Sequence, residues 1–369
     1  MKKIIINGAN GFVASNFITE LLSQNYKVIA LVRAGKNNSS SQRMNDVLSE
    51  MNEGNYINSS NLKVYNYSLL EENFNIPEKQ LETIFSCDVD YFHFAASLKY
   101  DINSKDKIFE TNLEGLENSI SVFSRYANSN SRFFFISTAY SCGKFEGIFQ
   151  EKFYENEEIS RFRNYYEQSK RYAENIVKKH IDINGLNGHI IRLSQVVGNC
   201  KTGVTKTDYG IFDFAKRIHS LANRYPYKSV RVHVDPESTQ NLIPIDTVAD
   251  YLMRTINAER VPVIMNFIAK NSIRNIYIIN SIRKLLPIQL IPVRTLKREE
   301  MDTIERMVSA GMSFTGSYIN TNLLFGTEEL DKVMLSVGNE ANEQAVFQML
   351  AYYIDTLSKK RSNVLKEEK

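Results

Sequence analysis

The stretch from Lys3 to Ser15 reads KIIINGANGFVAS. Its three consecutive isoleucines predict a short strand that is buried on both faces, because β-branched side chains pack well on a pleated sheet. Gly8 and Gly11 then predict a tight turn, and the residues from Phe12 onward follow a helical pattern. A strand, a glycine turn and a helix in this order are typical of an α/β protein.

The same alternation continues through the first two thirds of the chain. We expect strands at Lys3–Asn7, Lys27–Val32, Leu62–Tyr65, Tyr91–Phe94, Arg132–Ile136 and His189–Leu193, and helices at Phe12–Leu22, Lys105–Tyr126 and Tyr165–Lys179. Strands that alternate with helices predict a doubly wound parallel sheet. The region after Val261 has its own strands and helices, which predict a smaller C-terminal α/β lobe.

Composition excludes several classes of protein. The 369 residues carry 45 basic and 42 acidic side chains, a net charge of +3, and no long basic stripe, so we expect no nucleic-acid partner. Three widely spaced cysteines form neither a disulfide framework nor a zinc pattern, which favours a reducing cytoplasm and no metal site. No stretch approaches the roughly 20 apolar residues of a membrane span.

The glycine turn predicts a dinucleotide site. A turn after the first strand lets backbone approach a pyrophosphate, which then lies at the N-terminus of the next helix. We expect contacts from Gly8, Asn10, Gly11, Phe12 and Val13.

The tip of the second predicted strand favours one nicotinamide cofactor over the other. It reads LVRAGK with no acid, so Arg33 favours the 2′-phosphate of NADP(H), with Lys36 or Arg43 adding charge. NAD(H) stays a possible cofactor.

Tyr166 and Lys170 lie one helical turn apart on the same face of a predicted helix. A nearby ammonium lowers the pKa of a phenol from its usual value near 10, and such a phenol can exchange a proton with a carbonyl oxygen. About thirty residues earlier a strand ends in Ser137-Thr138, and Thr138 can hydrogen-bond the substrate oxygen. Ser137 is the competing candidate, on the opposite side of the strand.

Other candidates follow neighbouring predicted elements. Ala95, Ala96 and Ser97 are small enough to let a cofactor lie against backbone, and Asn112 is placed to hold a water or a backbone group behind the lysine. Lys99, Tyr100 and Tyr140 are candidate substrate contacts.

The motifs GxxGFxxS, LVR, HFAAS, TNxEG, STAYxxG, YxxSK, RxSxVVG and NLIPIDTVAD occur in this order. Together, over about residues 3–255, they resemble the extended short-chain dehydrogenase/reductases, and within them the branch of thioester reductases and fatty-acyl-CoA reductases. The resemblance implies a Rossmann fold, bound NADP(H) or NAD(H), and catalysis by Thr138, Tyr166 and Lys170. It also implies that Leu193 and Val196 pass the nicotinamide. The adenine-side acid of the family is replaced by Ser68, beside Leu69.

The domain boundaries that we expect are 1–197 for the NAD(P)-binding domain, with a strand and helix near 240–268 returning to it. Residues 198–240 and 269–358 would form the substrate-binding lobe, and 359–369 a disordered tail.

We therefore expect an NAD(P)H-dependent oxidoreductase that reduces a carbonyl or an acyl thioester, the latter delivered on CoA or on a separate carrier. A homodimer is possible. One alternative is a nucleotide-sugar epimerase using bound NAD, which shares the Tyr–Lys pair. Another is a cofactor-sensing protein without catalysis, which would not need an acid–base tyrosine.

Overall fold

The computed structural model describes residues 2–51, 57–99, 102–311, 318 and 320–367. The chain forms two compact units, which we describe separately. Unit 1 comprises Met1–Leu193, Val248–Phe267 and Phe325–Ser336, and unit 2 comprises Ser194–Thr247, Ile268–Leu324 and Val337–Lys369. No helix within the described residues has the length and apolar character that crossing a membrane requires.

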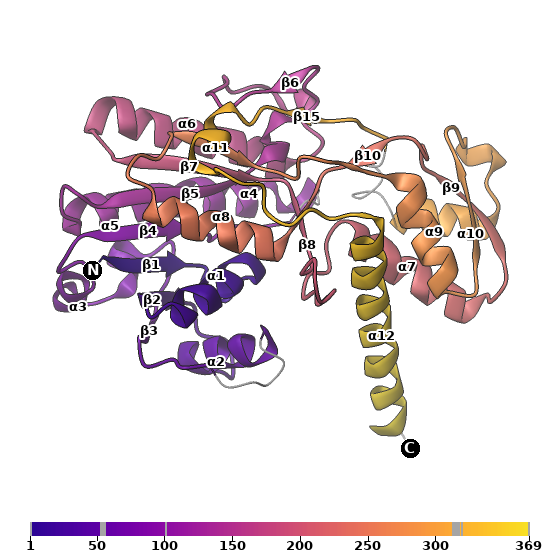
Figure 1. The fold of residues 1–369 in the computed structure, drawn as a ribbon, viewed down its shortest axis with the longest axis horizontal. Helices are drawn as coiled ribbons and strands as arrows, with labels where there is room; N and C mark the ends of the chain where they lie inside the picture. Colours follow the sequence, from indigo (N-terminus) through magenta and orange to yellow (C-terminus); the bar gives the residue numbers. More distant parts are fainter. Residues whose placement is uncertain (1, 52–56, 100–101, 312–317, 319, 368–369) are drawn as a thin grey trace. The chain divides into compact units, whose positions relative to one another are not determined.

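Unit 1 contains a parallel sheet whose seven strands, within the described residues, run in the order β12-β7-β5-β4-β1-β2-β3 (Figure 1). The strands are β1 (Lys3–Asn7), β2 (Lys27–Val32), β3 (Leu62–Asn66), β4 (Val89–His93), β5 (Arg132–Thr138), β7 (Gly188–Leu193) and β12 (Ile264–Phe267). In this order β2 and β3 are added on one side of β1, and β4, β5, β7 and β12 on the other, which confirms the predicted doubly wound sheet.

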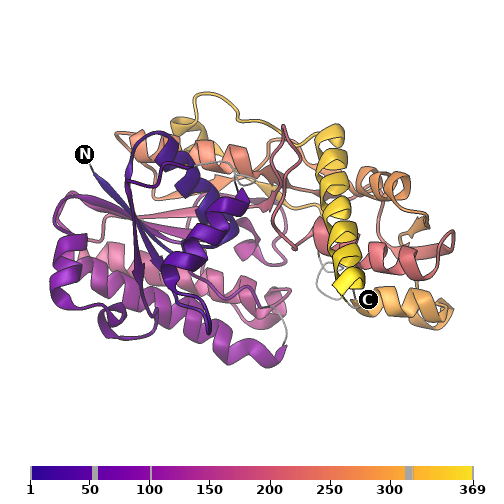
Figure 2. The ribbon, with the colours of Figure 1, turned by 90° about the horizontal axis from the view of Figure 1, so that it is seen from below.

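Helices cover both faces of this sheet (Figure 2). They are α1 (Phe12–Ser23), α2 (Ser40–Met51), α3 (Glu78–Ile84), α4 (Lys105–Phe109), α5 (Gly115–Tyr126), α6 (Tyr165–Asn184), α8 (Ile245–Asn257) and α11 (Glu328–Val333). The apolar core of one face joins the strands to α3, α5 and α6. On the other face, the ring of Phe17 in α1 packs edge-on against Phe92 of β4, with their centroids 5.0 Å apart.

The single helix predicted at Lys105–Tyr126 is wrong in detail. Between α4 and α5 the backbone forms a π-helical turn, η3 (Glu110–Glu114). Such a turn inserts one residue into a helix and is frequent at functional sites. Side-chain periodicity does not reveal it, because the apolar pattern resumes after the turn.

Unit 2 has its own core, and its described residues include short strand pairs. Strand β8 (Gln195–Val197) pairs in parallel with β11 (Leu242–Pro244), and β9 (Ser229–His233) in parallel with β14 (Gln289–Val293). Strand β10 (Thr239–Gln240) pairs antiparallel with β13 (Ile273–Arg274). The helices are α7 (Ile211–Arg224), α9 (Asn275–Leu285), α10 (Thr303–Gly311) and α12 (Glu343–Glu367). Helix α12 runs into the segment for which we expected a disordered tail.

The remaining elements are short. Strand β6 (Ile148–Phe149) pairs with β15 (Leu324–Phe325). The 3₁₀ turns are η1 (Glu72–Asn75), η2 (Ile102–Ser104), η4 (Ala139–Cys142), η5 (Ile159–Arg161) and η6 (Arg298–Glu300).

Candidate functional site

The turn between β1 and α1 brings two backbones into close contact. Gly8 has a φ of +60°, and a Cβ atom on it would lie 2.8 Å from the amide nitrogen of Ala95, just beyond β4. The amide of Gly11 donates to the carbonyl of Gly8 at 2.9 Å, and Gly11 is the N-cap of α1 without a side-chain cap. The turn therefore presents bare backbone and an uncapped 12-residue helix, which suits a phosphate group.

A buried polar cluster that the sequence did not reveal fixes this turn. The side-chain oxygen of Asn7 accepts a hydrogen bond from the amide of Ala95 at 3.0 Å, and its Nδ2 lies 2.9 Å from Nδ1 of His93. The phenol oxygen of Tyr67 accepts from the amide of Gly8 at 3.2 Å. Burial raises the pKa of Tyr67 to about 12 and lowers the pKa of His93 to about 3, so both groups stay neutral at physiological pH.

The end of β2 carries exposed cations. Arg33 and Lys36 are exposed, and the backbone carbonyl of Arg33 accepts a hydrogen bond from the guanidinium of Arg43. The stem of Arg43 lies over Gly35, where a Cβ atom would be 3.4 Å from its Cδ. These residues leave the tip of the strand without an acid of its own.

Ser68 and Leu69 follow β3. The amide of Ser68 donates to the carbonyl of Phe74 at 2.9 Å. The side chain of Leu69 covers Gly115 at the start of α5, with Cδ2 at 2.6 Å from the position of an added Cβ. The contacts of Ser68 and Leu69 described here are made by a backbone amide and by an apolar side chain.

Asn112 lies in the π-turn η3 and links the segment after β4 to the catalytic helix candidate, α6. Its Oδ1 accepts from the amide of Ser97 at 2.7 Å, and its Nδ2 donates to the hydroxyl of Ser169 at 2.9 Å. The Ser169 hydroxyl in turn donates to the carbonyl of Tyr166 at 2.8 Å. Asn112, 2% exposed, thus holds backbone and side-chain groups on two elements at once.

The start of α6 is fixed by its own side chains. Asn164 is the N-cap, and its Oδ1 accepts from the amide of Glu167 at 3.0 Å. The buried carboxylate of Glu167 accepts from the amide of Arg163 at 2.9 Å. These two contacts fix the first turn of the helix, which contains Tyr166.

Lys170 is 3% exposed, and its ammonium donates to the carbonyl of Ile136 in β5 at 2.9 Å. Burial lowers its pKa to about 7, although the carboxylate of Glu174, one turn further along α6, acts to raise it. Burial therefore makes the ammonium of Lys170 a stronger acid than that of a lysine in water.

The two hydroxyl candidates at the end of β5 have different partners. Thr138, the last residue of the strand, donates to the carbonyl of Leu193 at 3.2 Å and accepts from the amide of Tyr140 at the same distance. The hydroxyl of Ser137 donates to Glu174 at 2.6 Å. Ser137 is therefore committed to a buried carboxylate.

The remaining candidates are more scattered. The ring of Tyr140 packs edge-on against Phe325 at 6.4 Å. Lys99 is exposed, and Tyr100 lies outside the described residues. Leu193 ends β7 in unit 1, whereas Val196 lies in β8 of unit 2, paired with Ile243.

Comparison with known proteins places these features in context. The model of an NAD-binding family described as male sterility protein matches residues 6–252. The chain is 24% identical over 267 residues to an L-2-aminoadipate reductase from Schizosaccharomyces pombe; the match spans 67% of this chain and 18% of that protein.

Solved structures of other proteins share the fold. The terminal R domain from the myxalamid PKS-NRPS biosynthetic pathway has a TM-score of 0.77 at 16% identity, with 96% of this chain and 91% of that chain covered. A UDP-glucuronic acid 4-epimerase from Bacillus cereus, in complex with UDP-glucuronic acid and NAD, has a TM-score of 0.67 at 14% identity, with 96% and 99% covered.

Proposed function

We propose that this protein reduces a carbonyl or an acyl thioester with NADPH. The chain belongs to the NAD-binding family described as male sterility protein. It is therefore an NAD(P)-dependent oxidoreductase of the extended short-chain dehydrogenase/reductase type. The observation that carries this proposal is a chain of hydrogen bonds in unit 1. It runs from Asn112 through Ser169 to Tyr166, while Lys170 is bonded to the strand that ends at Thr138.

The residues around the glycine turn fit a dinucleotide. An added Cβ on Gly8 would collide with Ala95, so the turn has no room for a side chain, and the uncapped N-terminus of α1 offers free N–H groups to the pyrophosphate. We assign Asn10, Phe12 and Val13 to the same site, with Ala96 and Ser97 beside the cofactor and Ser68 and Leu69 at its adenine end. Leu193 and Val196 are assigned to the nicotinamide.

The exposed guanidinium of Arg33 supports NADP(H) over NAD(H). A planar guanidinium binds a phosphate in fork geometry, and no carboxylate stands at the tip of β2 to accept the 2′-hydroxyl of NAD.

When bound, the cofactor supplies the hydride. Tyr166 gives its phenolic proton to the carbonyl oxygen of the substrate, and Thr138 turns its single O–H from the carbonyl of Leu193 to donate a hydrogen bond to the same oxygen. When the substrate is a thioester, the hemithioacetal formed in this way releases the thiol and leaves an aldehyde. The ammonium of Lys170 stabilises the phenolate that Tyr166 leaves behind. Its position is set by the carbonyl of Ile136, and Asn112 sets the position of the helix turn behind it.

The substrate class rests on relatives. A curated relative is named as a reductase of L-2-aminoadipate, and one structural neighbour is a terminal R domain of a PKS-NRPS pathway. We therefore favour an acyl group presented as a thioester, on CoA or on a carrier. We assign Tyr140 and Lys99 to the substrate side, together with Tyr100.

The test is NADPH oxidation with a panel of acyl-CoA esters, aldehydes and ketones, followed by the variant Tyr166→Phe. We expect one class of carbonyl substrate to be turned over and Tyr166→Phe to lower kcat by about 10²- to 10⁴-fold. The matched control is Tyr165→Phe, at the neighbouring tyrosine whose ring packs against Phe109, and it should keep kcat within about twofold.

Cofactor choice is tested separately by Arg33→Ala. Loss of the guanidinium should raise the KM for NADPH about tenfold or more and leave the KM for NADH nearly unchanged. Full activity of Tyr166→Phe would overturn the mechanism. Interconversion of UDP-sugars without net oxidation of the cofactor would instead support an epimerase.

A further inference from the structure

Unit 1 contains a buried ion pair, Glu174–Arg192, that has no part in the chemistry described above. Nε of Arg192 lies 3.0 Å from Oε1 of Glu174, and Nη2 lies 2.7 Å from Oε2. Arg192 is fully buried, and Glu174 is 1% exposed. A buried pair of this kind contributes little net stability, because desolvation of the two charges offsets their attraction.

The carboxylate of Glu174 also holds both ends of the turn that contains Thr138. Its Oε1 accepts hydrogen bonds from the hydroxyl of Ser137 at 2.6 Å and from the hydroxyl of Ser141 at 3.0 Å. Thr138 lies directly after the first serine, and Tyr140 directly before the second. One carboxylate therefore fixes the backbone on either side of these two residues.

The same carboxylate acts on Lys170. Tyr166, Lys170 and Glu174 follow one another at intervals of four residues, so they share one face of α6. Glu174 raises the pKa of Lys170, which burial alone depresses. Facing this ammonium from β4 is His93, which stays neutral, and from β5 the ring of Phe135, 4.7 Å from the ammonium nitrogen.

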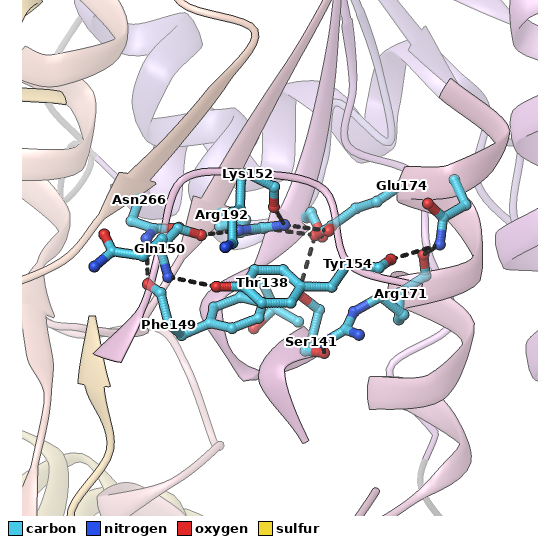
Figure 3. A network of polar contacts seen from close by, with 12 residues as sticks. Thr138, Ser141, Phe149, Gln150, Lys152, Tyr154, Arg171, Glu174, Arg192 and Asn266 are labelled. Atoms are coloured by element: carbon cyan, nitrogen blue, oxygen red, sulfur yellow. Dashed lines mark hydrogen bonds and ion pairs between the residues drawn. The ribbon is translucent and has the colours of Figure 1, made fainter. Parts of the chain in front are cut away.

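The remaining donors of Arg192 hold an irregular segment, residues 149–155. Nη1 donates to the carbonyl of Gln150 at 3.0 Å, and Nη2 to the carbonyl of Lys152 at 2.9 Å. Figure 3 shows the guanidinium between these carbonyls and Glu174. Arg171 and Asn266 bind further carbonyls, of Glu155 and Phe149. Arg192 thus joins this segment to Glu174, the carboxylate that lies one helical turn from Lys170.

We propose that Glu174 is a positioning residue of this enzyme: through Ser137 and Ser141 it holds Thr138 in place, and through its charge it keeps the ammonium of Lys170 beside Tyr166. This role rests on the proposed reductase function, since it acts through the three residues assigned there.

The decisive variant is Glu174→Gln, measured with NADPH and the substrate identified in the panel. We expect kcat to fall about tenfold or more while the KM for NADPH stays within about twofold. We also expect the alkaline limb of kcat/KM against pH to move to lower pH, because the lysine loses the anion that favours its charged form. Glu174→Asp, which keeps the charge, should restore the position of this limb.

The matched control is Asp90→Asn. Asp90 forms a largely buried ion pair with Arg132 at the amino ends of the same strands, with Lys2 3.6 Å from its carboxylate, so the variant disturbs a charged pair of the same sheet without touching Thr138 or Lys170. It should keep the wild-type kcat and pH profile. A folded Glu174→Gln enzyme with wild-type kcat and an unmoved limb would overturn the assignment.

A second variant covers the case in which Glu174→Gln does not fold. Ser137→Ala combined with Ser141→Ala keeps the ion pair, and it should lower kcat severalfold without moving the alkaline limb. Wild-type kcat in this double variant would also overturn the assignment. Tyr166→Phe distinguishes failure of the proposed function from failure of the role of Glu174. If Tyr166→Phe stays active, the reductase mechanism itself is wrong. If Tyr166→Phe is inactive and Glu174→Gln is fully active, only the role of Glu174 is wrong.

Discussion

The sheet of unit 1 carries one buried arginine–carboxylate pair at the amino ends of its strands and another at their carboxyl ends. The two pairs bind different groups. At the amino ends of the strands, Nε of Arg132 donates to Asp90 at 2.8 Å, and its Nη2 also donates to the carbonyl of Ile256 at the end of α8. At the carboxyl ends, Glu174 and Arg192 bind hydroxyls and carbonyls of irregular backbone.

The two ion pairs have the same chemistry, but they join different kinds of structure. The Asp90–Arg132 pair joins two regular strands to the last turn of a helix, where an arginine suits the free carbonyls. The Glu174–Arg192 pair joins the helix and strand to loops that carry the candidate catalytic groups. Only the second pair lies at the carboxyl ends of the strands, where parallel sheets bind their ligands.

The largest expected effect is on stability. Arg192→Ala leaves the carboxylate of Glu174 buried without its cation, so it should lower the free energy of unfolding by about 3–5 kcal/mol. Arg132→Ala should cost less, because Nζ of Lys2 lies 3.6 Å from Oδ1 of Asp90 and keeps a cation beside it. Urea denaturation followed by circular dichroism measures this loss. A small loss in Arg192→Ala would mean that water reaches the remaining carboxylate.

Replacing both partners of a pair by apolar residues should lower activity at one pair and not at the other. Asp90→Leu with Arg132→Met should leave stability unchanged or raise it by about 1–4 kcal/mol, and activity should stay the same. Glu174→Leu with Arg192→Met should also fold, but kcat should fall at least about tenfold because Ser137 and Ser141 lose their acceptor. Equal activity of the two double variants would contradict the inference that only the Glu174–Arg192 pair supports the candidate catalytic groups.

A smaller effect is expected at the glycine turn, which follows the carboxyl end of β1. Gly8→Ala forces a Cβ against Ala95 at a positive φ, and it should cost about 1–3 kcal/mol of stability. It should also raise the Kd for NADPH, measured by calorimetry. Gly185→Ala is the control: Gly185 has a φ of +67° at the end of α6 with no atom within 4 Å of the added Cβ, so cofactor binding should not change.

The smallest expected effect is a pH dependence of stability from Lys170. Because its pKa falls from 10.5 to about 7 on folding, the unfolded chain binds a proton that the folded chain releases above pH 7. Stability should therefore rise with pH, by about 1 kcal/mol between pH 7 and 8 from this group. Lys170→Met should remove that increment, whereas Lys27→Met, at an exposed lysine of the same sheet, should keep it. An unchanged slope in Lys170→Met would show that another group causes it.

The sequence was sufficient for the elements that rest on local pattern. Strands β1 and β2 have the predicted bounds, because continuous apolar runs between polar residues mark a strand that is buried on both faces. Strand β5 runs two residues further than predicted, to Thr138, because Ser137 and Thr138 continue the ladder with β7 although their side chains are polar.

The contacts that fix the candidate site were harder to predict. Glu174 and Arg192 lie on different elements, and only the crossover from α6 to β7 brings them together. One signal was present: Glu174 follows Lys170 by four residues, so the two share a helix face. For Asn7, at the end of an apolar strand, no local pattern indicated the buried amide contacts with Ala95 and His93.

The composition of unit 1 from three separate parts of the chain has a consequence for synthesis. Strand β12 pairs with β7 at the sheet edge, yet it ends at Phe267, some seventy residues after Leu193. A nascent chain released only as far as β7 would expose an unpaired parallel edge, which is a template for aggregation. On the ribosome, the sheet is therefore completed only after the first segment of unit 2, Ser194–Thr247, has been synthesised, and a fragment ending at Leu193 is a poor choice for isolating the nucleotide-binding unit.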